Sequence, residues 1–333
     1  MNKKILLLVI SVILILSGCS KANKENVLKE VENKYLKQDS YNLEGNMTII
    51  NNEDKHSYDV NVVYEKEEKY KVTLKNQINN HEQIILRNDE GVYVLTPSLN
   101  KSFKFQSDWP YNNSQAYLIK NIVDDITNDK KSTFSKKEET YIYTSKVNYS
   151  NNKKLVKQKV YIDKKCNLTK IEVLDNKNNI IMNMKINKIK TNEKIDDKYF
   201  KLENNMGISE KKEDDSKKTS VLEDVIYPVY MPVNTYLKNS ENKKFNNGER
   251  VILSYSGDSN FTLIEETINT ENTNQIVPVF GEMMSVGDVI GTVTENSVEW
   301  TSNGVSYYLA SNDMSVEEML NVANSITVLP VSK

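Results

Sequence analysis

The chain has 333 residues and a formal net charge of −2, with 44 Lys and Arg against 46 Asp and Glu. Such balanced charge gives little attraction for a polyanion, so no nucleic-acid partner is expected. With two cysteines and two histidines, the chain also has few ligands for a metal site or pairs for a disulfide framework.

Residues 1–18 have the pattern of a lipoprotein signal peptide. A short basic start precedes an apolar run that ends in Leu16-Ser17-Gly18, directly before Cys19. This order is typical of a secretory signal, and the cysteine makes Leu16, Ser17 and Gly18 a lipobox. A helix of about twelve residues would cover about 18 Å, too short for the roughly 30 Å hydrocarbon core. We expect cleavage before Cys19 and acylation (palmitate) of the mature chain, which would hang from the extracytoplasmic face of the cell membrane by its acyl chains.

A polar tether at 19–25 leads into the first predicted domain, 26–202. Apolar residues at helical spacing predict a helix over 26–38, and from Tyr41 the apolar period changes to two. Short strands separated by polar turns indicate an antiparallel meander with one covered face. The predicted strands are centred on 43–49, 58–62, 70–74, 84–86, 92–94, 103–105, 141–147, 157–162, 168–174 and 180–189.

One amphipathic helix interrupts these strands. We expect Ser114 as its N-cap, followed by Leu118, Ile122 and Ile126 on one face. These three residues, with Trp109, form a candidate hydrophobic groove in the concavity of the sheet. The alternative is that they only close the core.

Residues 203–220 are rich in charge and poor in apolar residues, which predicts a linker. A smaller α+β domain is expected over 221–333. Its signals are strands at 251–255 and 261–268, a hairpin around Asn303-Gly304, and a closing strand over 326–331. Ser315 and Glu318 have the spacing of a capping box at the start of the last helix.

Catalytic patterns are scarce. His56 and His81 have no second histidine or cysteine at ligand spacing, so no metal site or other cofactor is expected. Cys166, unpaired once Cys19 is acylated, is interpreted as a turn residue. Adjacent carboxylates such as Asp124-Asp125 are interpreted mostly as solvated surface. No catalytic residue is therefore assigned, and the protein is not expected to be an enzyme.

Three stretches resemble a known superfamily: the strand around Gly45, the run 83–97, and the run 96–110, TPSLNKSFKFQSDWP. They are similar to the LolA/LolB-type lipoprotein carriers, and the run 96–110 is closest to LolA-like sporulation and germination lipoproteins of spore-forming Gram-positive bacteria. The resemblance implies an α+β fold over 26–202, an unclosed antiparallel half-barrel with helices on its concave face.

The same resemblance implies a function in binding. Attachment at Cys19 would prevent free shuttling between membranes. The expected function is a membrane-anchored scaffold that binds a protein partner, such as a spore-cortex amidase, at the forespore or spore envelope. The alternative is a carrier or envelope sensor that binds a lipid, lipoprotein or acyl ligand in the concavity.

Overall fold

The computed structural model describes residues 23–51, 54–111, 113–149, 152–206, 222, 225–245, 248–267 and 275–326. The signal peptide, Cys19, most of the linker 203–220 and the expected closing strand beyond Ile326 lie outside these residues. Within the described part, no helix is both long and apolar enough to cross a membrane.

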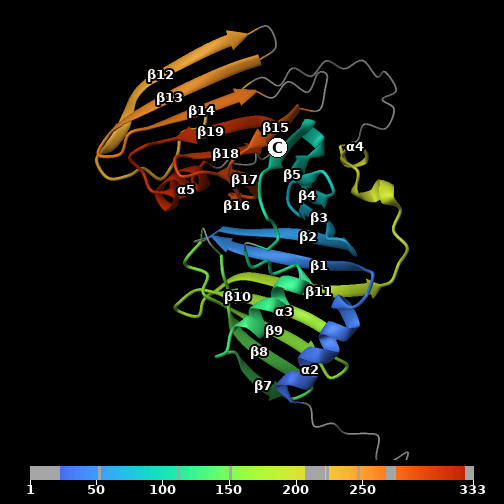
Figure 1. Cartoon of the computed structure of the whole chain (residues 1–333). Helices are drawn as coiled ribbons and strands as arrows, with labels where there is room; N and C mark the ends of the chain where they lie inside the picture. The colour runs from blue at the N-terminus through green and yellow to red at the C-terminus, as the bar shows by residue number, and fades with distance from the viewer. Residues whose placement is uncertain are drawn as a thin grey trace, which may run out of the picture.

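The described strands form two sheets (Figure 1). Strands of the first sheet are β1 (Ser40–Asn51), β2 (Asp54–Glu65), β3 (Lys69–Asn76), β4 (Glu82–Asn88), β5 (Gly91–Thr96), β6 (Lys101–Phe105), β7 (Thr133–Lys137), β8 (Thr140–Lys146), β9 (Lys157–Asp163), β10 (Leu168–Leu174), β11 (Ile180–Thr191) and β15 (Gln275–Val279). Their order is β15-β6-β5-β4-β3-β2-β1-β11-β10-β9-β8-β7. Neighbours are antiparallel except for the parallel pair of β6 and β15. The edge strands β7 and β15 do not meet, so the sheet is unclosed, as predicted.

The core of this sheet lies on its concave side, under α2 (Lys24–Val31) and α3 (Ile119–Asn128) (Figure 1). Alternate residues of β1, β2 and β3 are buried there, including Leu43, Val62 and Val72, each 0% exposed. A period of two brings one side of every strand into this core. The sequence pattern of 41–74 therefore predicted these strands correctly.

Gly45 lets β1 and β11 approach closely at a register shift. A Cβ atom at this position would lie 2.4 Å from the carbonyl oxygen of Lys185 and 2.6 Å from Cε of Met184. Any other residue would therefore push the strands apart at this shift.

The second sheet has the order β12-β13-β14-β19-β18-β17-β16 and packs against one helix, α5 (Val316–Asn324). Its strands are β12 (Thr235–Phe245), β13 (Gly248–Gly257), β14 (Phe261–Thr267), β16 (Glu282–Val286), β17 (Val289–Val293), β18 (Ser297–Ser302) and β19 (Val305–Ala310). The predicted hairpin is confirmed, with Asn303 and Gly304 at positive φ between β18 and β19. So is the cap, since the Ser315 side chain accepts a hydrogen bond from the backbone N–H of Glu318.

The predicted first helix is present as α2, which continues as a π-helical turn over Glu32–Leu36. Two other local expectations were wrong. Ser114 is not the N-cap of α3; Leu118 occupies that position, and the Ser114 hydroxyl instead donates to Asp125. The first sheet is also not covered on one face alone.

The second face is covered near β4 and β5. Short helical turns, Asp197–Phe200 and α4 (Leu202–Asn205), bring Phe200 and Met206 onto it. There they pack against Leu86 and Leu95, which point away from the concave core. Both faces of these two strands are thus buried, which explains their nearly continuous apolar sequences.

Candidate binding cavity

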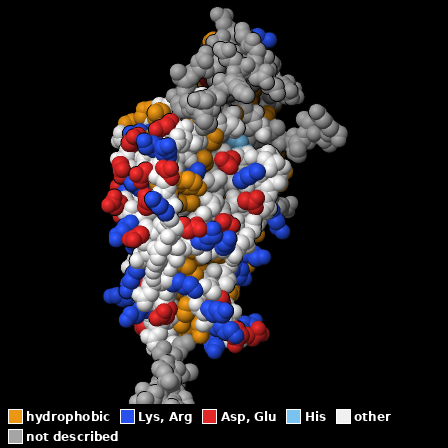
Figure 2. Space-filling view, turned by 90° about the vertical axis from the view of Figure 1, so that its right-hand side faces the viewer, with side chains coloured by type: hydrophobic (Ala, Val, Ile, Leu, Met, Phe, Trp, Pro, Cys, Tyr) orange, Lys and Arg blue, Asp and Glu red, His pale blue; other side chains and the backbone are white. Residues whose placement is uncertain are grey.

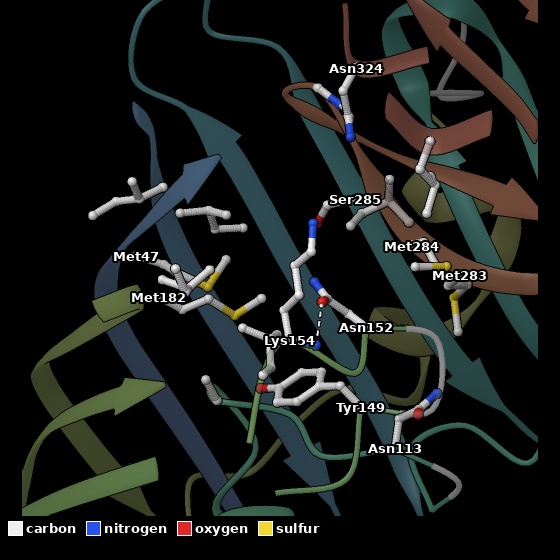
Figure 3. A pocket seen from close by; sticks show the side chains of 18 of the residues that line it. Met47, Asn113, Tyr149, Asn152, Lys154, Met182, Met283, Met284, Ser285 and Asn324 are labelled. Atoms are coloured by element: carbon white, nitrogen blue, oxygen red, sulfur yellow. Dashed lines mark hydrogen bonds between the residues drawn. The ribbon is translucent and has the colours of Figure 1, made fainter. Parts of the chain in front are cut away.

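A cavity of about 1000 Å³ lies where the first sheet meets the second (Figure 3). One side is formed by β1 to β4, β11 and the loops 109–117 and 149–155. The other side is formed by β16, β17 and α5. The cavity is therefore built by segments that lie far apart in the sequence.

The floor of the cavity is apolar because inward-facing positions of four neighbouring strands line it. Met47, Tyr58, Leu74 and Ile85 come from β1, β2, β3 and β4, and none is more than 6% exposed. Burial raises the pKa of the Tyr58 hydroxyl, and the nearby Asp288 carboxylate adds to this effect. The Tyr58 phenol is consequently neutral across the physiological range.

Four methionines face the cavity from opposite sides (Figure 3). Met47 and Met182 belong to the first sheet, whereas Met283 and Met284 belong to β16. Methionine is unbranched and polarizable, so its side chain adapts to apolar ligands of different shape. The arrangement suits an apolar group of variable outline.

The rim of the cavity is polar and carries an ion pair between its two sides. Lys154 Nζ lies 2.9 Å from Glu317 Oε1, joining the 149–155 loop to α5, and each side chain is 68% exposed. At this exposure the pair contributes only about 0–1 kcal/mol to stability. It can therefore open at little energetic cost when a ligand enters.

Behind the rim, side-chain hydrogen bonds join the sheets. Gln83 Nε2 donates to the carbonyl of Ile290 at 3.0 Å, and the Ile290 N–H donates to Gln83 Oε1 at 2.5 Å. Asn76 and Asn79 both donate to the Asp288 carboxylate, at 3.1 and 2.9 Å. These bonds fix β17 beside β3 and β4, and so fix the width of the cavity.

His81 is the one imidazole that the described residues place in the cavity wall. Burial lowers its pKa, which the Asp288 carboxylate partly opposes. Its buried Nε2 has no hydrogen-bond partner among the described residues. The neutral ring can therefore offer one polar contact to a ligand.

The structure separates the four predicted groove residues. Trp109 lines the cavity and is 2% exposed. Leu118, Ile122 and Ile126 are 0%, 1% and 1% exposed; they pack in the core under α3 and are not among the residues lining the cavity. Whether any of the four contacts a ligand remains a prediction.

Asp124 and Asp125 were interpreted from the sequence as solvated surface residues, but Asp125 is partly buried. Asp124 pairs with Lys120 at 2.6 Å on the solvent side of α3, but Asp125 faces inward. Burial raises the pKa of Asp125 to about 7, although the Ser114 hydroxyl bond acts in the opposite direction. The phase of the helix separates these neighbours.

Sequence reasoning missed most of the cavity. Met283, Met284 and Ile290 belong to β16 and β17, which had not been predicted, and Met182 had been interpreted only as a strand residue. The one available signal was the alternation of apolar residues over 43–49, which places Met47 on the inner face. This alternation does not indicate that β16 would lie on the other side of a cavity from Met47.

Figure 2 shows the molecule from the right of Figure 1, with cationic and anionic side chains mixed over this face. Among the described residues, no group of three or more His, Cys, Asp or Glu is placed to hold a metal ion.

The family described as "Sporulation protein YdcC-like" matches residues 2–200. Sporulation protein YdcC of Bacillus subtilis (strain 168) is 35% identical over 315 residues, covering 94% of this chain and 93% of that protein. The chain belongs to the YdcC-like family of sporulation proteins. The predicted resemblance to sporulation proteins is confirmed at this level.

Solved structures give more distant likenesses for this YdcC-like protein. MucB in complex with MucA(peri) has a TM-score of 0.29 at 13% identity, covering 91% of this chain and 96% of that chain. A LolA superfamily protein, NE2245 of Nitrosomonas europaea, gives 0.32 at 12%, covering 54% and 98%. The GerS lipoprotein complex with the CwlD amidase of Clostridioides difficile gives 0.22 at 16%, covering 50% and 95%. At such low TM-scores, the family assignment rests on the sequence matches alone.

Proposed function

We propose that this YdcC-like protein is a membrane-anchored, non-enzymatic lipoprotein that binds a protein partner during sporulation or germination. Its anchor would be acylated Cys19, and its position the extracytoplasmic face of a membrane of the forespore or spore. The family assignment supports the sporulation setting, and the lipobox sequence supports the anchor.

The observation that carries the binding function is the cavity between the sheets. It combines an apolar floor, adaptable methionines and a polar rim closed by the weak Lys154–Glu317 pair. An apolar floor supplies affinity by burial, and a few polar groups at the rim supply orientation. An apolar side chain of a partner, inserted between Met182 and Met283, would bury surface on both sheets.

A spore-cortex amidase is the partner class that we propose to test first, because the resemblance to germination lipoproteins implies it. CwlD and GerS are an amidase and a lipoprotein that form such a complex. In the present protein the partner would contact both sheets at once.

Affinity capture of the tagged protein from sporulating cells tests this proposal when both proteins and lipids are identified by mass spectrometry. The chain is captured in three forms: unchanged, Met182→Glu, and the control Ile78→Glu. Ile78 is 73% exposed and lies outside the cavity lining. A melting temperature for each form establishes that it is folded.

We expect the unchanged chain and Ile78→Glu to retain a specific protein at near-stoichiometric amounts, and Met182→Glu to lose most of it. A carboxylate in the cavity wall costs about 1–3 kcal/mol in binding, which weakens the complex about fivefold or more. Equal capture by all three folded forms would exclude the cavity as the binding site. Capture of no protein would reject the partner-binding function.

Lipid binding is the second candidate, favoured by the apolar floor and by the four methionines that face the cavity from opposite sides (Figure 3). Native mass spectrometry of the chain purified from cells distinguishes the two. A stoichiometric acyl ligand that disappears in Met182→Glu would identify a carrier or sensor. A protein partner without such a ligand would identify a scaffold.

A further inference from the structure

The first sheet has one face turned away from α2 and α3. On this face, lysine side chains gather on four neighbouring strands, β8 to β11. Side chains along a strand alternate between the faces of the sheet. On β9, the buried Gln158, Val160 and Ile162 point to the core, so Lys157 and Lys159 point outward. The same alternation defines the lysine face on β8 to β11: Lys146, Lys157, Lys159, Lys170 and Lys185.

Four of these lysines form two like-charged cross-strand pairs. Lys146 lies directly opposite Lys157, and Lys170 lies directly opposite Lys185. Like charges in this position destabilise a sheet. Glu172, 2.7 Å from Lys170, balances one of them. Within the described parts of the chain, no ion pair includes Lys146, Lys157 or Lys185.

The other half of the same sheet is arranged differently. On β3, Lys75 lies opposite Asp59, and Lys69 is 3.8 Å from Glu65. Opposite charges are thus paired on β2 and β3, whereas β8 to β11 carry two like-charged pairs beside one opposite pair, Lys159 and Glu172. The excess of positive charge is local, although the whole chain is slightly acidic.

The lysine face begins beside the point where the tether enters the fold. The Asp129 carboxylate accepts the backbone N–H of Lys146 at 2.9 Å. Its pKa is lowered by the backbone N–H groups of Lys146 and Lys131, and further by the cations of Lys146 and Lys24. Lys24, the first residue of α2, donates to Ser132, and the next residue, Thr133, pairs with Thr144 of β8, two residues before Lys146.

Only a short stretch of chain connects Lys24 to the proposed anchor at Cys19. Five residue steps reach at most about 17 Å when fully extended. A membrane that holds the acyl chains must consequently lie near the end of β8 and the start of β9, where Lys146 and Lys157 are found. Strands β16 and β17, which form the second-sheet side of the cavity, lie away from α2 (Figure 1).

We infer that the lysine face is a docking surface for the headgroups of an anionic membrane, which holds the half-barrel against the lipid that Cys19 is anchored in. This inference rests on the proposed lipoprotein anchor. It adds which face of the half-barrel lies against the membrane. A single acyl chain binds a membrane only weakly, and a basic patch is one of the second signals that make attachment stable. Lys146, Lys157 and Lys185, which form no ion pair among the described residues, fit that requirement by charge, and Lys146 fits it also by its position near the tether.

Vesicle binding by the chain from Ser20 to Lys333, which lacks the acylated cysteine but keeps every described residue, tests the inference. The probes are vesicles of equal parts phosphatidylglycerol and phosphatidylcholine, and vesicles of phosphatidylcholine alone. Each lysine near an anionic surface strengthens partitioning about fivefold. The double variant Lys157→Gln/Lys185→Gln should therefore bind the anionic vesicles about twenty-fivefold more weakly.

The matched control is Lys69→Gln/Lys75→Gln, which makes the same change in net charge on β3. We expect it to retain the binding of the unchanged chain. The lysine-face variant should also melt at the same or a higher temperature, because two like-charged pairs are removed. A loss of binding with a gain in stability is an outcome that misfolding cannot produce.

The inference would be overturned by equal binding to both kinds of vesicle, by equal weakening in the two double variants, or by no weakening in Lys157→Gln/Lys185→Gln. Binding to soluble polyglutamate but not to anionic vesicles would also reject the membrane, in favour of an acidic protein segment. Acylation of Cys19 is read separately, as a lipid mass on the mature chain, so failure of the anchor and failure of the docking face give different results.

Discussion

The side chain of Gln83 forms a two-way hydrogen bond with the backbone of Ile290, at 3.0 Å and 2.5 Å, in the manner of one residue of a β-ladder. Gln83 is 4% exposed and belongs to β4 of the first sheet, whereas Ile290 belongs to β17 of the second. The side-chain amide of Gln83 thus bonds to the backbone of β17 as a residue of a neighbouring strand would, and it links the two sheets beside the cavity.

Gln83→Ala should loosen this junction. Both polar groups of Ile290 would lose their partner, at a cost of about 1–3 kcal/mol. Urea unfolding measures the loss. Gln77→Ala is the control, because the Gln77 side chain is exposed and, among the described residues, bonds only to Asp59 on the surface. Equal stability of the two variants would contradict a coupling role for Gln83.

Glu265 should make stability fall with rising pH. This residue is 0% exposed, and burial raises its pKa from 4.5 to about 7, despite the Ile226 N–H that it accepts. The folded state therefore favours the protonated carboxyl. Its contribution is complete below the unfolded pKa near 4.5 and is lost as the pH rises to about 7, with a total of about 3 kcal/mol.

Glu265→Gln removes this titration, so the variant should be more stable than the unchanged chain at pH 8 and similar at pH 4. Thermal unfolding across that range gives the comparison. Glu266→Gln, at the neighbouring half-exposed position that pairs with Arg250, is the control. A parallel pH dependence in the chain and in Glu265→Gln would show that another group is responsible.

Ile122→Asp separates a groove function of α3 from a packing function. Because Ile122 is 1% exposed, the new carboxylate would be buried without a partner, which costs several kcal/mol. We expect the first sheet to unfold, as followed by tyrosine fluorescence and circular dichroism. A folded Ile122→Asp protein that has lost ligand or partner binding would instead support the groove.

Cys19→Ala tests the anchor. The lipobox predicts that this variant accumulates as an unprocessed precursor without a diacylglycerol thioether, since the modified thiol is what the peptidase requires. Intact-mass measurement of membrane and soluble fractions checks both features. Cleavage after Gly18 with a lipid still attached would contradict the assignment.

The sequence predicted the elements whose pattern is local. Alternating apolar residues over 41–74 identified β1 to β3, and the spacing of Ser315 and Glu318 identified the start of α5. β12 could not be found in this way, because every residue after Thr235 on this edge strand is exposed and no period-two burial is imposed on it. Residue propensity and apolar pattern therefore predict a strand poorly when neither of its faces is covered.

Features that depend on contacts between the two sheets could not be predicted from the sequence. Gln83 looks like an ordinary polar residue until Ile290 lies beside it, and the cavity exists only because β16 faces β1. The same holds for Asp125, whose burial depends on the rotation of α3. Such features follow from tertiary packing, which a single sequence does not encode locally.

The parallel pairing of β15 with β6 makes completion of the first sheet a late event in synthesis. Ser102 and Phe103 on β6 find their partners, Ile276 and Val277, only after the strands up to β14 of the second sheet have been made. Until then β6 presents an unpaired edge, and open edges recruit other chains. A chain shortened at 202 would carry that open edge permanently, so its aggregation would report a missing strand rather than an unstable half-barrel.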